Sequence, residues 1–180
     1  MNPQPTTSVS RRPFANAPTT CQARILDILL AQDGSATRLC EAVAQGPVGV
    51  QVVRQQMTGS VPDLVRQLLR GDRFIERVSF LFARGEVMLD SVSYVALDGL
   101  DAGLKADLLA GLRPIGHLLT SLWTRREPIA EAASLAAPIW TAVGLPDDAA
   151  TRAYRIVAPD GPRMIVVETY RRGMLMKRRE

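Results

Sequence analysis

The sequence predicts an α+β fold built on a single antiparallel β-sheet. Helical patterns come first in the chain, and two pairs of strand patterns follow, each pair joined by a short turn. The regular alternation of strands and helices that builds a parallel sheet is absent from the sequence. With 180 residues, of which 47% are hydrophobic, the chain is expected to bury one core and form one domain.

Two helices are expected near the start of the domain. Apolar residues recur at helical spacing in 21–32, and an Asp-Gly pair at 33–34 ends this pattern with turn-forming residues. Ser35 can cap a second helix over 36–44, which the Gly-Pro pair at 46–47 stops.

Strand patterns dominate the next part of the chain. The β-branched residues of 48–56 predict a strand, and a short helix over 62–70 follows, with Pro62 in its first turn. The clearest alternation of apolar residues covers 73–97. It predicts two long strands that fold back around 83–86.

The second half of the chain repeats this order. A helix over 101–112, with a glycine near its C-terminal end, precedes a second helical segment over 115–123. Segment 124–140 stays open between strand and helix, because its alanines favour a helix whereas two prolines interrupt it. Residues 151–170 predict a second hairpin with its turn at 159–162.

The positive net charge of +4 is concentrated at the two ends of the chain. Two of the 22 basic residues lie in 1–20, and five lie in 171–180 beside one of the 18 acidic residues, which leaves 21–170 with 15 basic and 17 acidic residues. Such a body lacks the broad basic face of a duplex-binding domain, so no nucleic-acid partner is expected. We expect a flexible leader over 1–20, a single domain over 21–170 and a basic, solvated tail over 171–180. A nucleic-acid or membrane contact through that tail is the minor alternative.

No sequence signature points to a cofactor, a metal or a membrane, and none of the three is expected. The sequence has no glycine-rich nucleotide loop, no GxSxG and no HExxH motif. It has neither an apolar run long enough for a membrane span nor a secretory signal, so a cytoplasmic protein is expected. Cys21 and Cys40 lack the spacing of a metal site and are expected to be free, buried thiols. The single histidine, His117, excludes a multi-histidine metal centre and is expected to be a surface or packing residue.

Charged residues on the predicted strands are the main functional candidates. Because residues two apart share a strand face, Arg77 lies on the same face as Ser79, while Glu76 lies on the other. Glu168 is the only acid in 163–170. Its carboxylate lies at the sheet edge in water, is buried with a cation, or holds a proton near neutrality and serves as a general acid. The pattern leaves these three possibilities open.

Other candidates carry a weaker signal. Arg152 and Tyr154 share a face of the neighbouring strand and could look into a pocket, whereas the arginine pair at 125–126 is expected on a solvated face. Trp123 and Trp140 are expected in the core or at its rim, because basic residues do not interleave with several aromatic residues.

Five short segments, in order, resemble the chorismate pyruvate-lyase (4-hydroxybenzoate synthase) family, and the resemblance covers residues 23–170. The segments are RILDILLAQDGSATRLCEAV, VQVVRQQ, IERVSFL, LRPIGHLL, and RAYRI followed by MIVVETY. The resemblance implies a lyase without a cofactor that converts chorismate to 4-hydroxybenzoate and pyruvate. It implies that Arg77 binds the ring carboxylate, and that Glu168 faces the ring hydroxyl and the departing ether and acts as the general acid.

The resemblance also implies a fold and further ligand contacts. The fold is an antiparallel sheet with helices on one side and helical flaps over an internal pocket. Main-chain groups at Val52 and Ile115 are expected to contact the ligand. Gly116 and Arg152 are further expected substrate-binding residues. The chain is expected to be a monomer or a dimer.

The chain departs from the family pattern at two places. Val92 stands where many relatives carry a charge, and arginines at 171–172 replace the usual proline after the closing strand. Loss of the charge is expected to change how the second carboxylate of the substrate is held, with Arg152 and Arg155 as the candidate replacements. One alternative is a lyase that yields a different aromatic acid. Another is a non-catalytic binding domain like the effector domains of some transcription regulators; the short leader, with no expected winged-helix module, favours the enzyme.

Overall fold

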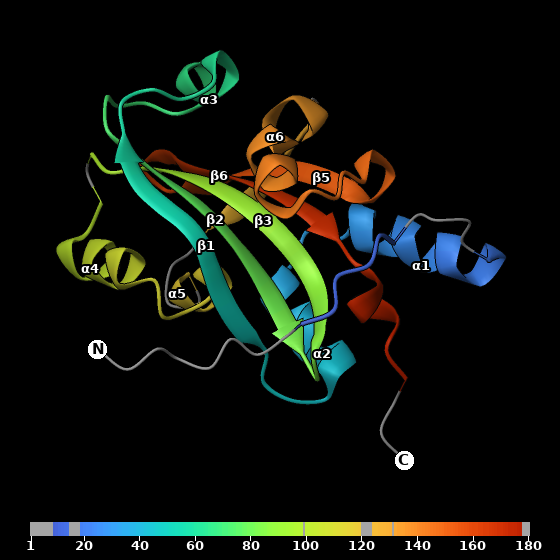
Figure 1. Ribbon diagram of the computed structural model, residues 1–180. Helices are drawn as coiled ribbons and strands as arrows, with labels where there is room; N and C mark the ends of the chain where they lie inside the picture. Colours follow the sequence, from blue (N-terminus) through green and yellow to red (C-terminus); the bar gives the residue numbers. More distant parts are fainter. Residues whose placement is uncertain (1–8, 15–18, 99, 120–123, 131, 178–180) are drawn as a thin grey trace.

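The structure is a computed structural model that describes residues 9–14, 19–98, 100–119, 124–130 and 132–177. These residues form one six-stranded sheet with helices on both faces (Figure 1). The predicted α+β class and its single antiparallel sheet are confirmed.

Two hairpins build the sheet, and its strands follow the order β1-β2-β3-β6-β5-β4. The strands are β1 (Gly49–Thr58), β2 (Phe74–Ala83), β3 (Glu86–Ala96), β4 (Arg125–Ile129), β5 (Thr151–Ala158) and β6 (Gly161–Tyr170). Neighbouring strands are antiparallel, and β2–β3 and β5–β6 are the two predicted hairpins. The pairing of β3 with β6 joins the hairpins in the middle of the sheet.

The first five α-helices lie where the sequence predicts helices, whereas the sixth lies largely in the segment that the sequence left open. The helices are α1 (Thr20–Ala31), α2 (Ala36–Ala44), α3 (Asp63–Leu68), α4 (Ala102–Ala110), α5 (Ile115–Leu118), α6 (Ala132–Val143) and the short 3-10 helices η1 (Asp148–Ala150) and η2 (Arg172–Leu175). Residues 120–123 of the predicted helix 115–123, with Trp123, lie outside the described residues. The ambiguous segment 124–140 contains a strand and most of a helix, which explains why neither pattern fitted its whole length.

Local chemistry accounts for several ends of these elements. Ser35 Oγ accepts a hydrogen bond from Arg38 N at 3.4 Å and caps α2, as predicted. Gly111 ends α4 in the left-handed conformation, with a φ of 70°. Arg84 and Gly85 form the turn of the first hairpin, where φ values of 50° and 73° suit the twist of the flanking strands.

Helices cover both faces of the sheet. Helices α1, α2, α4 and α5 pack on one face, and α3 and α6 pack on the other (Figure 1). Leu135 and Ile139 of α6 contact the same core cluster as Val92 and Ile165. The fold that the resemblance implies has helices on one side, so the layer of α3 and α6 is an addition to it.

The described parts of both chain ends pack on the sheet, which corrects the expectation of a flexible leader and a solvated tail. Asp90 of β3 accepts a hydrogen bond from Arg11 Nε at 3.0 Å and another from Arg171 Nε at 2.6 Å. Arg171 is fully buried, and Phe14 belongs to the core. Composition does not reveal that two arginines from opposite ends of the chain share one buried carboxylate.

Two further expectations concern the thiols and the membrane. Cys40 is buried and lies 3.6 Å from the sulfur of Met174, whereas Cys21 is exposed, so only one of the two thiols is buried as expected. Cys21 stands in the first turn of α1, on the side that faces solvent. Among the helices of the described residues, none is long and apolar enough to cross a membrane.

Candidate active site

A small cavity, called the inner cavity below, lies between the sheet and a cover made by α2 and α5. Its volume is about 40 Å³. The cover contributes residues 35–37 at the start of α2 and 114–116 at the start of α5. Strands β2 and β3 contribute three serines, Ser79, Ser91 and Ser93. Because Glu168 of β6 lines the same space, this cavity is the candidate active site.

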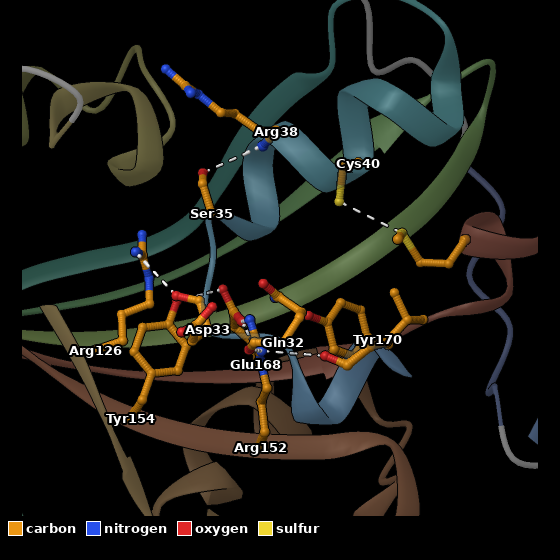
Figure 2. A network of polar contacts seen from close by, with 12 residues as sticks. Gln32, Asp33, Ser35, Arg38, Cys40, Arg126, Arg152, Tyr154, Glu168 and Tyr170 are labelled. Atoms are coloured by element: carbon orange, nitrogen blue, oxygen red, sulfur yellow. Dashed lines mark hydrogen bonds and ion pairs between the residues drawn. The ribbon is translucent and has the colours of Figure 1, made fainter. Parts of the chain in front are cut away.

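Glu168 is buried together with a cation, which is the second of the three possibilities left open by the sequence. Its side-chain Oε2 accepts hydrogen bonds from Nε and Nη2 of Arg152 at 2.9 and 2.8 Å. Its Oε1 accepts a hydrogen bond from the hydroxyl of Tyr154 at 2.9 Å. Figure 2 shows the carboxylate between Tyr154 and Tyr170, with Arg152 beside it. Glu168 therefore accepts hydrogen bonds on both oxygens and is held in one orientation.

Arg152 is placed to support Glu168 and does not line the inner cavity. Its Nη1 donates to the carbonyl oxygens of Leu29, at 3.2 Å, and Gln32. Its guanidinium carbon lies 5.1 Å from the ring centre of Tyr154 and 5.4 Å from that of Tyr170. Four of its five N–H groups donate to Glu168, Leu29 and Gln32, so its main contacts position Glu168, and its contact with substrate stays a prediction.

Both tyrosines beside Glu168 have a raised pKa, and Tyr154 donates a hydrogen bond to its carboxylate. Burial, with the charge of Glu168 as the second cause, raises the pKa of the Tyr154 hydroxyl well above its usual value. The same two causes raise the pKa of Tyr170, whose hydroxyl accepts from Gln32 Nε2 at 3.1 Å. Tyr154 therefore keeps its proton and donates it towards Glu168 across the ordinary pH range.

Arg77 is a buried cation with unused donors at the edge of the inner cavity. It is 1% exposed, and its Nη2 donates to the carbonyl oxygen of Arg113 at 3.0 Å. Its Nε and Nη1 are buried and have no hydrogen-bond partner, and burial lowers its pKa. Its side chain is not part of the cavity wall, but it lies opposite Ser93 in register and two residues from Ser79, which both line that wall.

The neighbouring Glu76 shows how differently the two strand charges are satisfied. Glu76, on the other face of β2, accepts from Arg54 Nη2 at 2.7 Å and from Gln56 Nε2 at 3.3 Å. Within the part of the chain that the structure describes, no carboxylate is paired with Arg77. A buried guanidinium without an anion is costly, so a carboxylate ligand would be stabilised beside Arg77.

The other predicted contact residues fall in two groups. Ile115 and Gly116 line the inner cavity at the start of α5. Val52 does not line it; Val50, two residues earlier on β1, does. The side chain of Val52 lies beside Gly111 at the end of α4 instead.

Val92 and Arg155, the residues discussed for the second carboxylate, lie away from the inner cavity. Val92 is buried against α6 on the opposite face of the sheet, so a charged residue at this position would not line the inner cavity. Arg155 pairs with Glu127 at 2.5 Å, and neither residue lines the inner cavity. The suggestion that Arg155 replaces the lost charge is therefore not supported by the geometry.

Arg126 of β4 is a site residue that the sequence did not reveal. It was expected on a solvated face, yet it lines the inner cavity and is half-buried. Its guanidinium carbon lies 5.8 Å from the ring centre of Tyr154 (Figure 2). No strand alternation pointed to it, because β4 has only five residues inside a segment of mixed pattern.

Other places among the described residues suit anion chemistry less well. A groove of about 630 Å³ lies between α4 and the second hairpin, but its wall holds Asp101, Asp107 and Asp160 against Arg163 alone. A dianion would be repelled there. No group of three His, Cys, Asp or Glu side chains within the described ranges could hold a metal ion.

Comparisons with known proteins point to one enzyme family. The sequence model of a family described as "Chorismate pyruvate-lyase Rv2949c-like" matches residues 30–176. The chain is 28% identical over 161 residues to the chorismate pyruvate-lyase of Mycobacterium leprae, which covers 84% of this chain and 76% of the relative. It is also 28% identical over 164 residues to the chorismate pyruvate-lyase of Mycobacterium tuberculosis H37Rv, covering 84% and 81% of the two chains.

Solved structures that match part of the chain include proteins described as transcription regulators. The effector domain of PhnF from Mycobacterium smegmatis superposes with a TM-score of 0.45 and 16% identity, covering 77% of this chain and 88% of that one. A GntR-family regulator from Bacillus cereus gives a TM-score of 0.45 and 11% identity, covering 74% and 97%.

Proposed function

Because the chain belongs to the chorismate pyruvate-lyase Rv2949c-like family, we propose that it converts chorismate to 4-hydroxybenzoate and pyruvate in the inner cavity. The observation that carries this proposal is the pair Arg77 and Glu168. One is a buried cation whose Nε and Nη1 have no partner, and the other is a buried carboxylate in the cavity wall. The reaction of chorismate needs a cation to bind the ring carboxylate and a group that transfers a proton, and this pair supplies both.

Arg77 is proposed to bind the carboxylate on the ring. Its two unpartnered nitrogens can donate charge-assisted hydrogen bonds, which are stronger than neutral ones. The start of α2, where residues 35–37 line the cavity, adds the positive end of a helix dipole to the same space. Both features favour an anion inside a closed site.

Glu168 is proposed to move the proton. In the reaction, the ring carbon that carries the hydroxyl loses its proton, and the electrons of that C–H bond complete the aromatic ring. The bond between the adjacent ring carbon and the ether oxygen breaks, and its electron pair leaves with the enolpyruvyl oxygen. Protonation of the enolpyruvate then gives pyruvate, so atoms and electrons balance without an oxidant or reductant. The contacts of Glu168 make it a proton acceptor first and, once protonated, the general acid that the family resemblance implies.

Exclusion of water supports the same reaction. The inner cavity of about 40 Å³ is smaller than typical ligand pockets, so the cover has to move to admit a substrate and can then enclose it. A closed, dry site strengthens the contacts of Arg77 and Glu168 with the developing charges. Formation of an aromatic ring supplies much of the driving force.

The test is to incubate the purified protein with chorismate and to separate and quantify the products by chromatography. The proposal predicts 4-hydroxybenzoate and pyruvate in equal amounts, faster than chorismate decomposes alone. A different aromatic acid would identify a related lyase. Tight binding of 4-hydroxybenzoate without turnover would identify a binding domain and would contradict the proposed activity.

A further inference from the structure

A second cavity, called the outer cavity below, lies directly beyond the inner one. Its volume is about 300 Å³, and its wall includes Gln32, Asp33 and Arg152. The two cavities share two wall residues, Arg126 and Tyr154. These two side chains therefore form the partition between the closed inner space and a larger space beside it.

Arg126 has hydrogen-bond donors without a partner at this partition. Its Nε is buried and has no hydrogen-bond partner, and its Nη1 makes a long hydrogen bond of 3.4 Å to the carbonyl oxygen of Asp33. The neighbouring arginines on β4 and β5 are paired: Arg125 and Arg155 each form an ion pair with Glu127, at 2.6 and 2.5 Å. Among these three described arginines, Arg126 alone lacks a carboxylate partner.

The position of Arg126 complements that of Arg77 across the sheet. Arg77 stands on β2, Glu168 on β6 and Arg126 on β4, so β6 lies two strands from each arginine's strand. Two strand spacings amount to about 10 Å on either side. A cation thus stands at each end of the site, Arg77 buried and Arg126 half-buried, and the proton-transfer group stands between them.

Chorismate has the matching order of groups. One carboxylate sits on the ring, the breaking ether bond lies in the middle, and the second carboxylate sits on the enolpyruvyl group. Arg152 is less suited than Arg126 to bind the second carboxylate, because four of its five N–H groups already donate to Glu168, Leu29 and Gln32.

We propose that Arg126 binds the enolpyruvyl carboxylate of the substrate and that the outer cavity beyond it receives the three-carbon keto acid after the ether bond breaks. This inference rests on the proposed function and adds to it the residue that recognises the second carboxylate. When the C–O bond breaks, its electron pair goes to the enolpyruvyl oxygen, and the guanidinium of Arg126 stabilises the negative charge of the departing acid. The aromatic product stays with Arg77, so the two products separate at the partition.

Arg126→Met tests this inference, with Arg125→Met as the matched control on the same strand. Loss of one charge-assisted contact should lower kcat/KM for chorismate by about ten- to a hundredfold. The dissociation constant for 4-hydroxybenzoate, which lacks the second carboxylate, should not change. Inhibition of the wild type by added pyruvate should weaken in Arg126→Met, and Arg126→Lys should restore part of the loss. Arg125→Met should match the wild type in every assay.

The outcomes separate this inference from the proposed function. If Arg126→Met turns over chorismate like the wild type, or weakens 4-hydroxybenzoate binding as much as turnover, the role of Arg126 is refuted while the lyase activity stands. If the wild type forms no 4-hydroxybenzoate, the proposed function fails and the inference falls with it. Unchanged 4-hydroxybenzoate binding in Arg126→Met also shows that the variant is folded.

Discussion

At the scale of single residues, two buried glutamates show what distinguishes the site from the rest of the sheet. Glu76 and Glu168 are both buried and both paired with an arginine. Glu76 lies on the opposite face of β2 from Arg77, whereas Glu168 lines a cavity and has a tyrosine hydroxyl on its second oxygen. The chemical difference therefore lies in access to a ligand, since burial and charge are alike.

Glu168→Gln should lower kcat for chorismate by about a hundredfold or more, because proton transfer by a positioned side chain contributes about 10²–10⁴ to a rate. The variant should still bind 4-hydroxybenzoate through Arg77. Steady-state kinetics and calorimetric titration measure the two quantities. Glu76→Gln is the matched control and should keep wild-type kcat. Equal losses in both variants would show that the effect comes from removing a buried charge and would contradict the role of Glu168.

The predictability of the site residues followed the regularity of the strands that carry them. Alternation along β2 and β6, together with the family resemblance, singled out Arg77 and Glu168. Alternation could not assign Arg126 to a strand face, because β4 has only five residues and lies in the same mixed segment as α6. The alternation of the strands also could not show that Arg152 donates to Glu168 and to the carbonyl oxygens of Leu29 and Gln32. Those contacts depend on the packing of the C-terminal end of α1 against β5.

At the scale of elements, the cover of the inner cavity depends on close contact between α5 and α2. His117 Nε2 lies 2.9 Å from Glu41 Oε1, which links the two helices. A Cβ added to Gly116 would stand 2.9 Å from Thr37 Cβ and 3.0 Å from Ser35 Oγ, and it would collide with Thr37 Oγ1. Glycine is required at this position by the approach of the helices.

Gly116→Ala should push α5 away from α2. Strain or lost contact of about 1–3 kcal/mol should raise KM for chorismate by about five- to a hundredfold. The backbone at Gly116 needs no glycine conformation, so the effect should come from contact with Thr37 and Ser35. Gly46→Ala is the control, because an added Cβ there meets no atom within 4 Å. Wild-type KM in Gly116→Ala would show that the cover tolerates the extra methyl group and would refute this account of α5.

At the scale of the whole molecule, the sheet and the order of its elements were predictable, whereas the docking of the chain ends was not. Strands and helices leave local patterns in the sequence, in which apolar residues recur every second residue in a strand and about every 3.6 residues in a helix. The pairing of Arg11 and Arg171 with Asp90 joins residues about as far apart as the chain allows, and neither local pattern nor net charge encodes it. The positive charge of the two ends is therefore partly internal to the fold.

The buried tyrosines predict how stability changes in alkali. Burial raises the pKa of Tyr94, Tyr154 and Tyr170 above 10.0, so above pH 10 the unfolded chain loses these protons while the folded chain keeps them. This contribution to stability is fully present below pH 10 and is lost as the pH rises towards the folded-state pKa values. Each phenol should lower the free energy of unfolding by about 1.4 kcal/mol per pH unit in that window.

Tyr94→Phe tests one of these phenols outside the site, since Tyr94 packs in the core cluster of α6. The substitution breaks no hydrogen bond, because the buried Tyr94 hydroxyl has no partner among the described residues. Urea unfolding at pH 8 to 11 should show the same stability as the wild type or more at pH 8, and a smaller loss above pH 10. A loss as steep as that of the wild type would contradict the role of Tyr94.

The measurement that tests the central claim most directly is kcat/KM for chorismate, determined for the wild type, Arg77→Met and Arg73→Met. Arg73 precedes β2, and its side chain is mostly exposed, so its variant controls for a lost surface charge. The account predicts turnover by the wild type and by Arg73→Met, and a loss of about ten- to a hundredfold in Arg77→Met, since one charge-assisted contact is removed. Absence of turnover by the wild type, or equal values for the wild type and Arg77→Met, would contradict it.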